Sequence, residues 1–135
     1  MKFFLAFVAV FVAVDVAIVA YVMVRRFRKG ISEKDIQEVQ AMWKSIIREK
    51  DMRHAILEAD KLLDHALQLK GYRGNLGTKL KKANRLFGGN INRVWAAHKV
   101  RNNIAHQMNF EVDEKVYRSS MLAFKEAFRD LGIFS

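Results

Sequence analysis

The sequence contains no cysteine and no proline, and only seven of its 135 residues are glycine. Without cysteine the chain can form neither a disulfide nor a cysteine-ligated metal site. Proline and glycine are the residues that interrupt helices most strongly, so their scarcity beside frequent Ala, Leu, Lys and Arg favours helices. The sequence shows no alternating strand pattern and no internal repeat. An all-α fold is therefore predicted.

Acidic residues are missing from residues 65–110, although the chain has fourteen Asp and Glu in all and a formal net charge of +10. A long stretch with charge of one sign fits an anionic polymer, and RNA is the predicted partner. The alternatives are simple solvation of the charges, or attraction to anionic lipid. The residues predicted to contact RNA are Lys79, Lys81, Lys82, Arg85, Arg93, His98 and Lys99.

Charge is also nearly missing from residues 3–24, where Asp15 interrupts an otherwise uncharged run. As a helix this run would span about 33 Å, which is enough to cross the core of a bilayer. An Asp in the middle of the membrane costs roughly 3 kcal/mol, whereas the Phe, Leu, Ile and Val side chains together return about 4–8 kcal/mol. Insertion is therefore predicted, with Asp15 either facing a partner helix or simply protonated in lipid.

A cleaved signal peptide is the rival interpretation of this run. A signal peptide usually has an apolar core of about 7–15 residues and small residues at its cleavage site, whereas this run continues directly into RRFRKG. A single-pass membrane anchor is therefore predicted for residues 1–29. Because more cations follow the run than precede it, the positive-inside rule predicts that residues 30–135 form a cytoplasmic domain. Lys2 precedes the run, and Arg25, Arg26, Arg28 and Lys29 follow it.

Capping residues and apolar periodicity divide residues 30–135 into a bundle of four or five helices. Ser32 with Asp35 resembles a capping pair for a helix that ends near Arg48. Asp51 is expected to cap a second helix over roughly residues 52–70, although the two helices could also form one bent rod. The face of the first helix that is expected to be buried contains Ile36, Val39, Met42, Trp43, Ile46 and Ile47.

The second half of the domain begins with the loop GYRGNLG and a short basic helix, TKLKKANRLF, that ends at Gly88. Asn90 is predicted to cap a helix over about residues 91–106, and Asp113 is predicted to cap a last helix over about residues 114–131. The face of the last helix that is expected to be buried contains Val116, Tyr117, Leu122 (or Met121), Phe124, Phe128 and Leu131.

The predicted helix of residues 91–106 carries an unusual set of polar residues. His98, Asn102 and His106 are spaced i, i+4 and i+8 and so share one face, with Arg101 at its edge. The Arg fork fits phosphate oxygens, and His can exchange a proton with a ribose 2′-hydroxyl or a leaving oxygen near neutral pH. No carboxylate lies nearby in the sequence, so cleavage of RNA without a metal ion is the predicted chemistry.

Two simpler explanations compete with this prediction. Arg and His at the C-terminal end of a helix interact favourably with its dipole, and His98 could be a core histidine whose ring is satisfied by hydrogen bonds. Trp43 and Trp95 are expected in the core rather than as platforms for base stacking. Asp60 adjoins an apolar stripe, so a pair with a buried Arg is an alternative to a solvated position.

The segment RNNIAH resembles the signature of the HEPN superfamily, an Arg followed after four to six residues by a His, often with a polar residue just after the Arg. Arg101, Asn102 and His106 match these elements, and the wider pattern over about residues 43–132 is similar to small bacterial HEPN-like proteins. The resemblance implies a helical bundle whose dimer brings two motifs together across its interface. It also implies metal-independent endoribonuclease activity, with no cofactor.

Under this resemblance Arg101 would hold the scissile phosphate, His106 would be the general base or acid, and Asn102 would orient one of them. The predicted function is a membrane-anchored RNase that works as a homodimer through the helix of residues 91–106. One alternative is an inactive HEPN-like module that binds RNA or a protein at the membrane, because the superfamily also has inactive members. Another is a membrane-tethered helical scaffold whose basic face contacts lipid.

Overall fold

The computed structural model describes residues 1–28 and 30–135, without the side chains of residues 26–28. The described residues form helices and no strand, which confirms the predicted all-α fold. The chain divides into two compact units, Met1–Gly30 and Ile31–Ser135. This division falls next to the boundary expected after residue 29.

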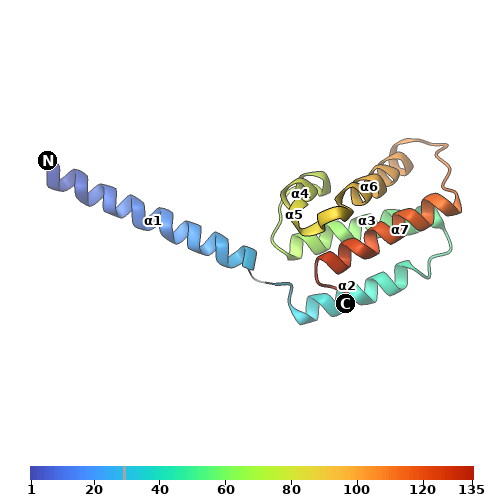
Figure 1. Ribbon diagram of the computed structural model, residues 1–135. Coiled ribbons are helices and arrows are strands. Elements are labelled where there is room, and N and C mark those ends of the chain that lie inside the picture. Colours follow the sequence, from blue (N-terminus) through green and yellow to red (C-terminus); the bar gives the residue numbers. More distant parts are fainter. Residues whose placement is uncertain (29) are drawn as a thin grey trace. The chain divides into compact units, whose positions relative to one another are not determined.

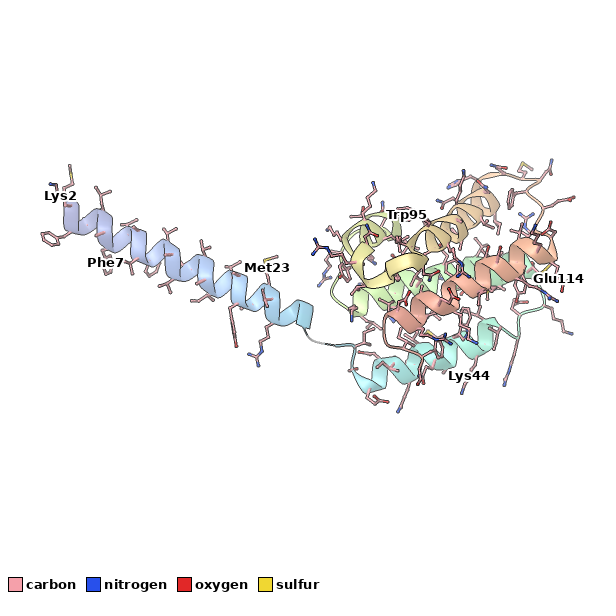
Figure 2. All side chains as sticks on the ribbon, viewed as in Figure 1. Lys2, Phe7, Met23, Lys44, Trp95 and Glu114 are labelled. Atoms are coloured by element: carbon pink, nitrogen blue, oxygen red, sulfur yellow. The ribbon has the colours of Figure 1, made fainter. Side chains whose placement is uncertain are left out.

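The first unit contains one helix, α1 (Lys2–Arg28) (Figure 1). All of its described side chains are exposed. Apolar side chains, among them those of Phe7 and Met23, project from it in all directions (Figure 2). Over Lys2–Arg25 the helix is long and apolar enough to cross a membrane. The prediction about its orientation depends on Arg26, Arg28 and Lys29, which lie outside the described side chains.

The second unit is built around α3 (Met52–Leu69), which packs against α2 (Glu33–Ile46), α4 (Leu76–Lys82), α6 (Ile91–His106) and α7 (Glu114–Asp130) (Figure 1). The short helix α5 (Asn84–Phe87) and a 3-10 turn (Gly88–Asn90) connect α4 to α6. One stripe of α3 is buried along its whole length, as its apolar spacing predicts. It contains Ala55, Ile56, Ala59, Asp60, Leu62, Leu63, Ala66 and Leu67.

Local sequence signals set most of the helix starts. Ser32, Asp51 and Asp113 each accept a hydrogen bond from a backbone N–H in the first turn, as predicted. A turn between Ile46 and Met52 separates α2 from α3, so these are two helices. Asn90 directly precedes α6, as predicted, but its side chain makes no capping hydrogen bond, because its backbone is already helical (φ −84°, ψ −13°) and such a bond needs an extended backbone. Its Nδ2 donates instead to the carbonyl of Ala123 on α7 at 3.3 Å.

The core confirms some predicted apolar positions and corrects others. Trp43 is buried and packs edge-on against Phe128, with ring centroids 5.3 Å apart. Met42 and Ile47 are 47% and 52% exposed, because α2 packs mainly against α3 and buries only a narrow stripe. Of the two alternative core positions on α7, Met121 is buried, whereas Leu122 is 48% exposed.

Candidate functional site

A cleft of about 740 Å³ lies where α3, α4 and α6 come together. Helix α3 contributes Asp60, Lys61 and Asp64 to its wall, and α6 contributes His98, Arg101 and Asn102. The cleft therefore joins the acid-free segment to carboxylates that lie outside that segment in the sequence. Polar and charged side chains from two helices converge on this cleft.

Four side chains in this wall form a closed set of polar contacts, which we call the Asp60 ring. Asp60 Oδ1 lies 2.8 Å from His98 Nδ1, and His98 Nε2 lies 3.5 Å from Asn102 Nδ2. Arg101 Nη1 donates to Asn102 Oδ1 at 3.1 Å. Arg101 Nε lies 3.4 Å from Asp60 Oδ2, an ion pair without hydrogen-bond alignment. The Asp60 ring thus links α3 to α6 through Asp60, His98, Asn102 and Arg101.

Asp60 is in the ring because it occupies the buried stripe of α3 one turn after Ile56, where it is only 4% exposed. Burial raises the pKa of its carboxyl, while the hydrogen bond with His98 and the charges of His98 and Arg101 oppose this rise. A buried carboxyl group requires such partners. Asp60 does face an Arg, as one alternative predicted, but Arg101 is 37% exposed rather than buried, and His98 is the closer partner.

The contacts of the ring select one tautomer of neutral His98. A guanidinium can only donate, so Asn102 must turn its amide oxygen to Arg101 and its amide nitrogen to His98. Nε2 of His98 then acts as an acceptor, and the ring proton lies on Nδ1, where it is donated to Asp60. The imidazole therefore has a proton-accepting nitrogen in a side chain that lines the cleft.

Arg101 retains the capacity to bind an anion. Its Nη1 bonds Asn102 and its Nε faces Asp60, but its Nη2 has no hydrogen-bond partner among the described residues. The side chain is 37% exposed, so its outer edge is open to solvent. A planar fork with a free edge at a cleft suits a phosphate oxygen.

His106 is outside the cleft wall, unlike Arg101 and Asn102, with which the sequence grouped it. It is the last residue of α6 and is exposed. On an α-helix two residues five positions apart are separated by about 7.5 Å along the axis and about 140° around it. Arg101 and His106 therefore leave the helix in different directions. Of the polar face predicted from the sequence, His98, Asn102 and the edge residue Arg101 line the cleft, whereas His106 does not.

Three of the basic residues in the acid-free segment are paired with acids from elsewhere in the chain. One is Arg101, which faces Asp60 as described above. The other two are Lys79 and Arg93. Lys79 is 3% exposed and donates to the Asp64 carboxylate at 2.9 Å, which corrects the prediction that it contacts RNA and gives Asp64 a partner. Arg93 pairs with Glu126 at 2.7 Å but stays half exposed. Lys81, Lys82, Arg85 and Lys99 are exposed and form no ion pair with any described residue.

Trp95 is half-buried beside the ring rather than in the core. Its indole lies edge-on to His98, with ring centroids 6.0 Å apart. A Cβ added to Gly77 of α4 would lie 3.7 Å from the indole, so Trp95 fills the space between α4 and His98. Figure 2 shows it on α6. Its large ring restricts where the imidazole of His98 can move.

No group of three His, Cys, Asp or Glu within the described part of the chain is arranged to hold a metal ion. Comparisons with protein-family models, with curated proteins and with solved structures find no match for this chain. The function must therefore be inferred from the cleft, from the Asp60 ring and from the exposed basic residues.

Proposed function

We propose that this chain is a membrane-anchored, HEPN-type endoribonuclease that cleaves RNA through its own 2′-hydroxyl group without a metal ion. The observation that carries the proposal is the Asp60 ring, which sets a guanidinium with a free Nη2 beside an imidazole with an accepting Nε2. Both groups line one cleft. These are the two kinds of side chain that a metal-independent transesterification of RNA needs.

In the proposed reaction Arg101 binds the scissile phosphate and stabilises the charge that develops on it. His106 takes part in proton transfer, and Asn102 orients its neighbours. His106 lies outside the cleft of its own chain, and in this proposal a second copy supplies the His106 that acts on a phosphate bound by Arg101. A two-fold dimer with its axis near α6 would bring the two motifs together, since such an interface is self-complementary.

RNA is held mainly by exposed cations outside the cleft. Lys81, Lys82 and Arg85 follow one another from the end of α4 into α5, and Lys99 lies on α6. Arg93 can add its charge if phosphate competes with Glu126, because the pair is exposed and such pairs are weak. Contacts of this kind give binding that falls steeply with salt.

Helix α1 spans the membrane in this proposal, and the domain of residues 31–135 faces the cytoplasm. The length and apolar surface of α1 support the span, and the cluster of Arg25, Arg26, Arg28 and Lys29 after it supports the orientation. Protease added to right-side-out vesicles should leave the domain intact, whereas protease added to inside-out vesicles should digest it. The opposite pattern would reverse the orientation.

A second candidate is a module that binds RNA or a protein at the membrane without cleaving it. Two observations favour it: His106 is outside the cleft, and Asp60 offsets part of the charge of Arg101. The deciding experiment incubates the full-length protein in detergent micelles with mixed RNA and EDTA, beside His106→Ala and the control His65→Ala, which removes an exposed histidine on α3.

The RNase proposal expects cleavage by the wild type and by the His65 control, and a fall of about 10²–10⁴ in the rate for His106→Ala. Binding of RNA without cleavage by any of the three proteins would establish the second candidate. Cleavage that disappears in EDTA would reject the metal-independent mechanism.

A further inference from the structure

We infer that His98, positioned by Asp60, is the general base of the proposed reaction and accepts the proton of the RNA 2′-hydroxyl at Nε2. This inference rests on the proposed RNase function. It settles which histidine acts as the base, a role that the motif alone leaves open. It also places the base and the phosphate-binding Arg101 in the same chain, one turn apart on α6.

The contacts of the Asp60 ring orient the imidazole of His98 for its role as the base. The carboxylate of Asp60 accepts the Nδ1 proton at 2.8 Å, which fixes the tautomer and stabilises the imidazolium that forms when Nε2 takes a proton. Asp60 is 4% exposed, so water does not screen this contact strongly. The side chain of His98 is 14% exposed and its residue lines the cleft, so Nε2 is shielded but reachable.

The weakest contact of the ring is the one that a substrate would replace. His98 Nε2 and Asn102 Nδ2 are 3.5 Å apart, at the outer limit of a hydrogen bond, whereas the Nδ1 contact to Asp60 is short. A 2′-hydroxyl that donates to Nε2 at about 2.8 Å would form the better bond. The same Asn102 keeps its oxygen on Arg101, so the phosphate ligand and the base stay coupled.

The step is a transesterification in which atoms and charge balance. Nε2 of His98 takes the proton of the 2′-hydroxyl, and the 2′-oxygen forms a new bond to phosphorus. The bond from phosphorus to the 5′-oxygen breaks, and that oxygen takes a proton from the imidazolium of His106. The products are a 2′,3′-cyclic phosphate and a 5′-hydroxyl, and solvent returns both histidines to their starting protonation states.

The separation of the two histidines supports this division of roles. His98 and His106 are eight residues apart, which corresponds to about 12 Å along a helix, and of the two only His98 lines the cleft. His98 has a fixed tautomer and a place in the cleft beside Arg101, while His106 is exposed at the helix end. The base therefore belongs to His98, and the acid is the His106 of a second copy.

The test uses His98→Asn in the full-length protein in micelles. The asparagine amide can place a donor where Nδ1 was, so the contact with Asp60 is kept while the atom that accepts the proton is removed. The matched control is His65→Asn, the same substitution at an exposed site on α3. Single-turnover cleavage, RNA affinity and thermal unfolding are measured for the wild type and both variants across pH.

The expected result is a fall of about 10²–10⁴ in the cleavage rate of His98→Asn, with RNA affinity and unfolding temperature near those of the wild type. The wild-type rate should decline with unit slope on the acid side, where the base is protonated, and this decline should be absent from the residual activity of His98→Asn. His65→Asn should behave as the wild type does.

Three other results are distinguishable. Cleavage by His98→Asn at close to the wild-type rate would overturn the inference and leave the RNase function standing. A wild type that binds RNA but never cleaves it would overturn both. If His98→Asn is destabilised, its rates are measured at a temperature at which it stays folded, and an acid-side decline that persists in its residual activity would overturn the assignment of the base.

Discussion

His98 Nδ1 on α6 lies 2.8 Å from Asp60 Oδ1 on α3, although 38 positions separate the two residues in the chain. This contact places the only strongly buried carboxylate of the described residues next to the RNNIAH segment. It gives one imidazole a fixed tautomer and gives the guanidinium of Arg101 a neighbour of opposite charge. The candidate site therefore depends on a pair that belongs to two different helices.

The Asp60 carboxyl should leave a signature in the pH dependence of stability. Burial raises its folded-state pKa above the ordinary value of 3.8, so between those two values the folded protein binds more protons than the unfolded chain. The free energy of unfolding contributed by this group then falls as pH rises through that window. Chemical denaturation should show that Asp60→Asn gains stability relative to the wild type as pH rises from about 4. A difference between the two proteins that is constant over pH would show that the carboxyl titrates normally.

Arg101→Lys tests whether the planar fork is required. An ammonium keeps the positive charge but cannot bond Asn102, face Asp60 and hold a phosphate oxygen at once. We expect cleavage to fall by about 10²-fold or more, with RNA affinity nearly unchanged because the exposed lysines supply most of it. Filter-binding and single-turnover assays on the same preparation measure the two quantities. Full activity with lysine would reduce the role of Arg101 to that of a simple charge.

Lys79 and Lys82 lie on the same helix and should behave in opposite ways. Lys79→Ala removes a buried ammonium from its pair with the partly exposed Asp64 and should lower the free energy of unfolding by about 1–3 kcal/mol, without changing the salt dependence of RNA binding. Lys82→Ala should leave stability within about 0.5 kcal/mol and reduce the log–log salt slope by about 0.7 if it contacts one phosphate. If Lys79→Ala reduced the slope as Lys82→Ala does, Lys79 would have to leave its buried position when RNA binds.

A mixture of two inactive variants tests the dimer. In the proposed mechanism Arg101→Ala lacks the phosphate ligand and His106→Ala lacks the acid, so a mixed dimer has one complete site if each site combines both chains. Random mixing should restore about a quarter of the wild-type activity, since half of the dimers are mixed and each has one good site of two. The two proteins are combined in micelles and assayed for RNA cleavage. No recovery at any ratio, with subunit exchange shown by labelled protein, would mean that the two residues act within one chain.

The features that the sequence predicted well are those that depend on neighbours along the chain. Caps at Ser32, Asp51 and Asp113 are local, and so is the apolar stripe of α3, so both could be read before the structure was known. The capping hydrogen bond expected at Asn90 does not form because the 3-10 turn before α6 gives this residue a helical backbone, which its residue type does not reveal.

The features that the sequence predicted poorly depend on how the helices pack. The acid-free segment suggested an unpaired cationic surface, but packing brings Asp60, Asp64 and Glu126 to three of its basic residues. The i, i+4 spacing of His98 and Asn102 correctly predicted that these two of the four residues of the Asp60 ring lie on one face of α6. The role of Asp60 was visible only as a polar residue at an apolar position of α3, a signal that suggested an Arg partner without saying which one and gave no indication of His98.

A DNA oligonucleotide that contains a single ribonucleotide, incubated with the full-length protein in EDTA, tests whether the 2′-hydroxyl is the nucleophile. We predict one cut, directly 3′ of the ribose, and a fragment that ends in a 2′,3′-cyclic phosphate, because only that nucleotide has the attacking hydroxyl. The same oligonucleotide with a 2′-O-methyl group should bind equally well and stay intact. Cleavage of the methylated substrate, or a requirement for a divalent metal, would contradict the proposed mechanism.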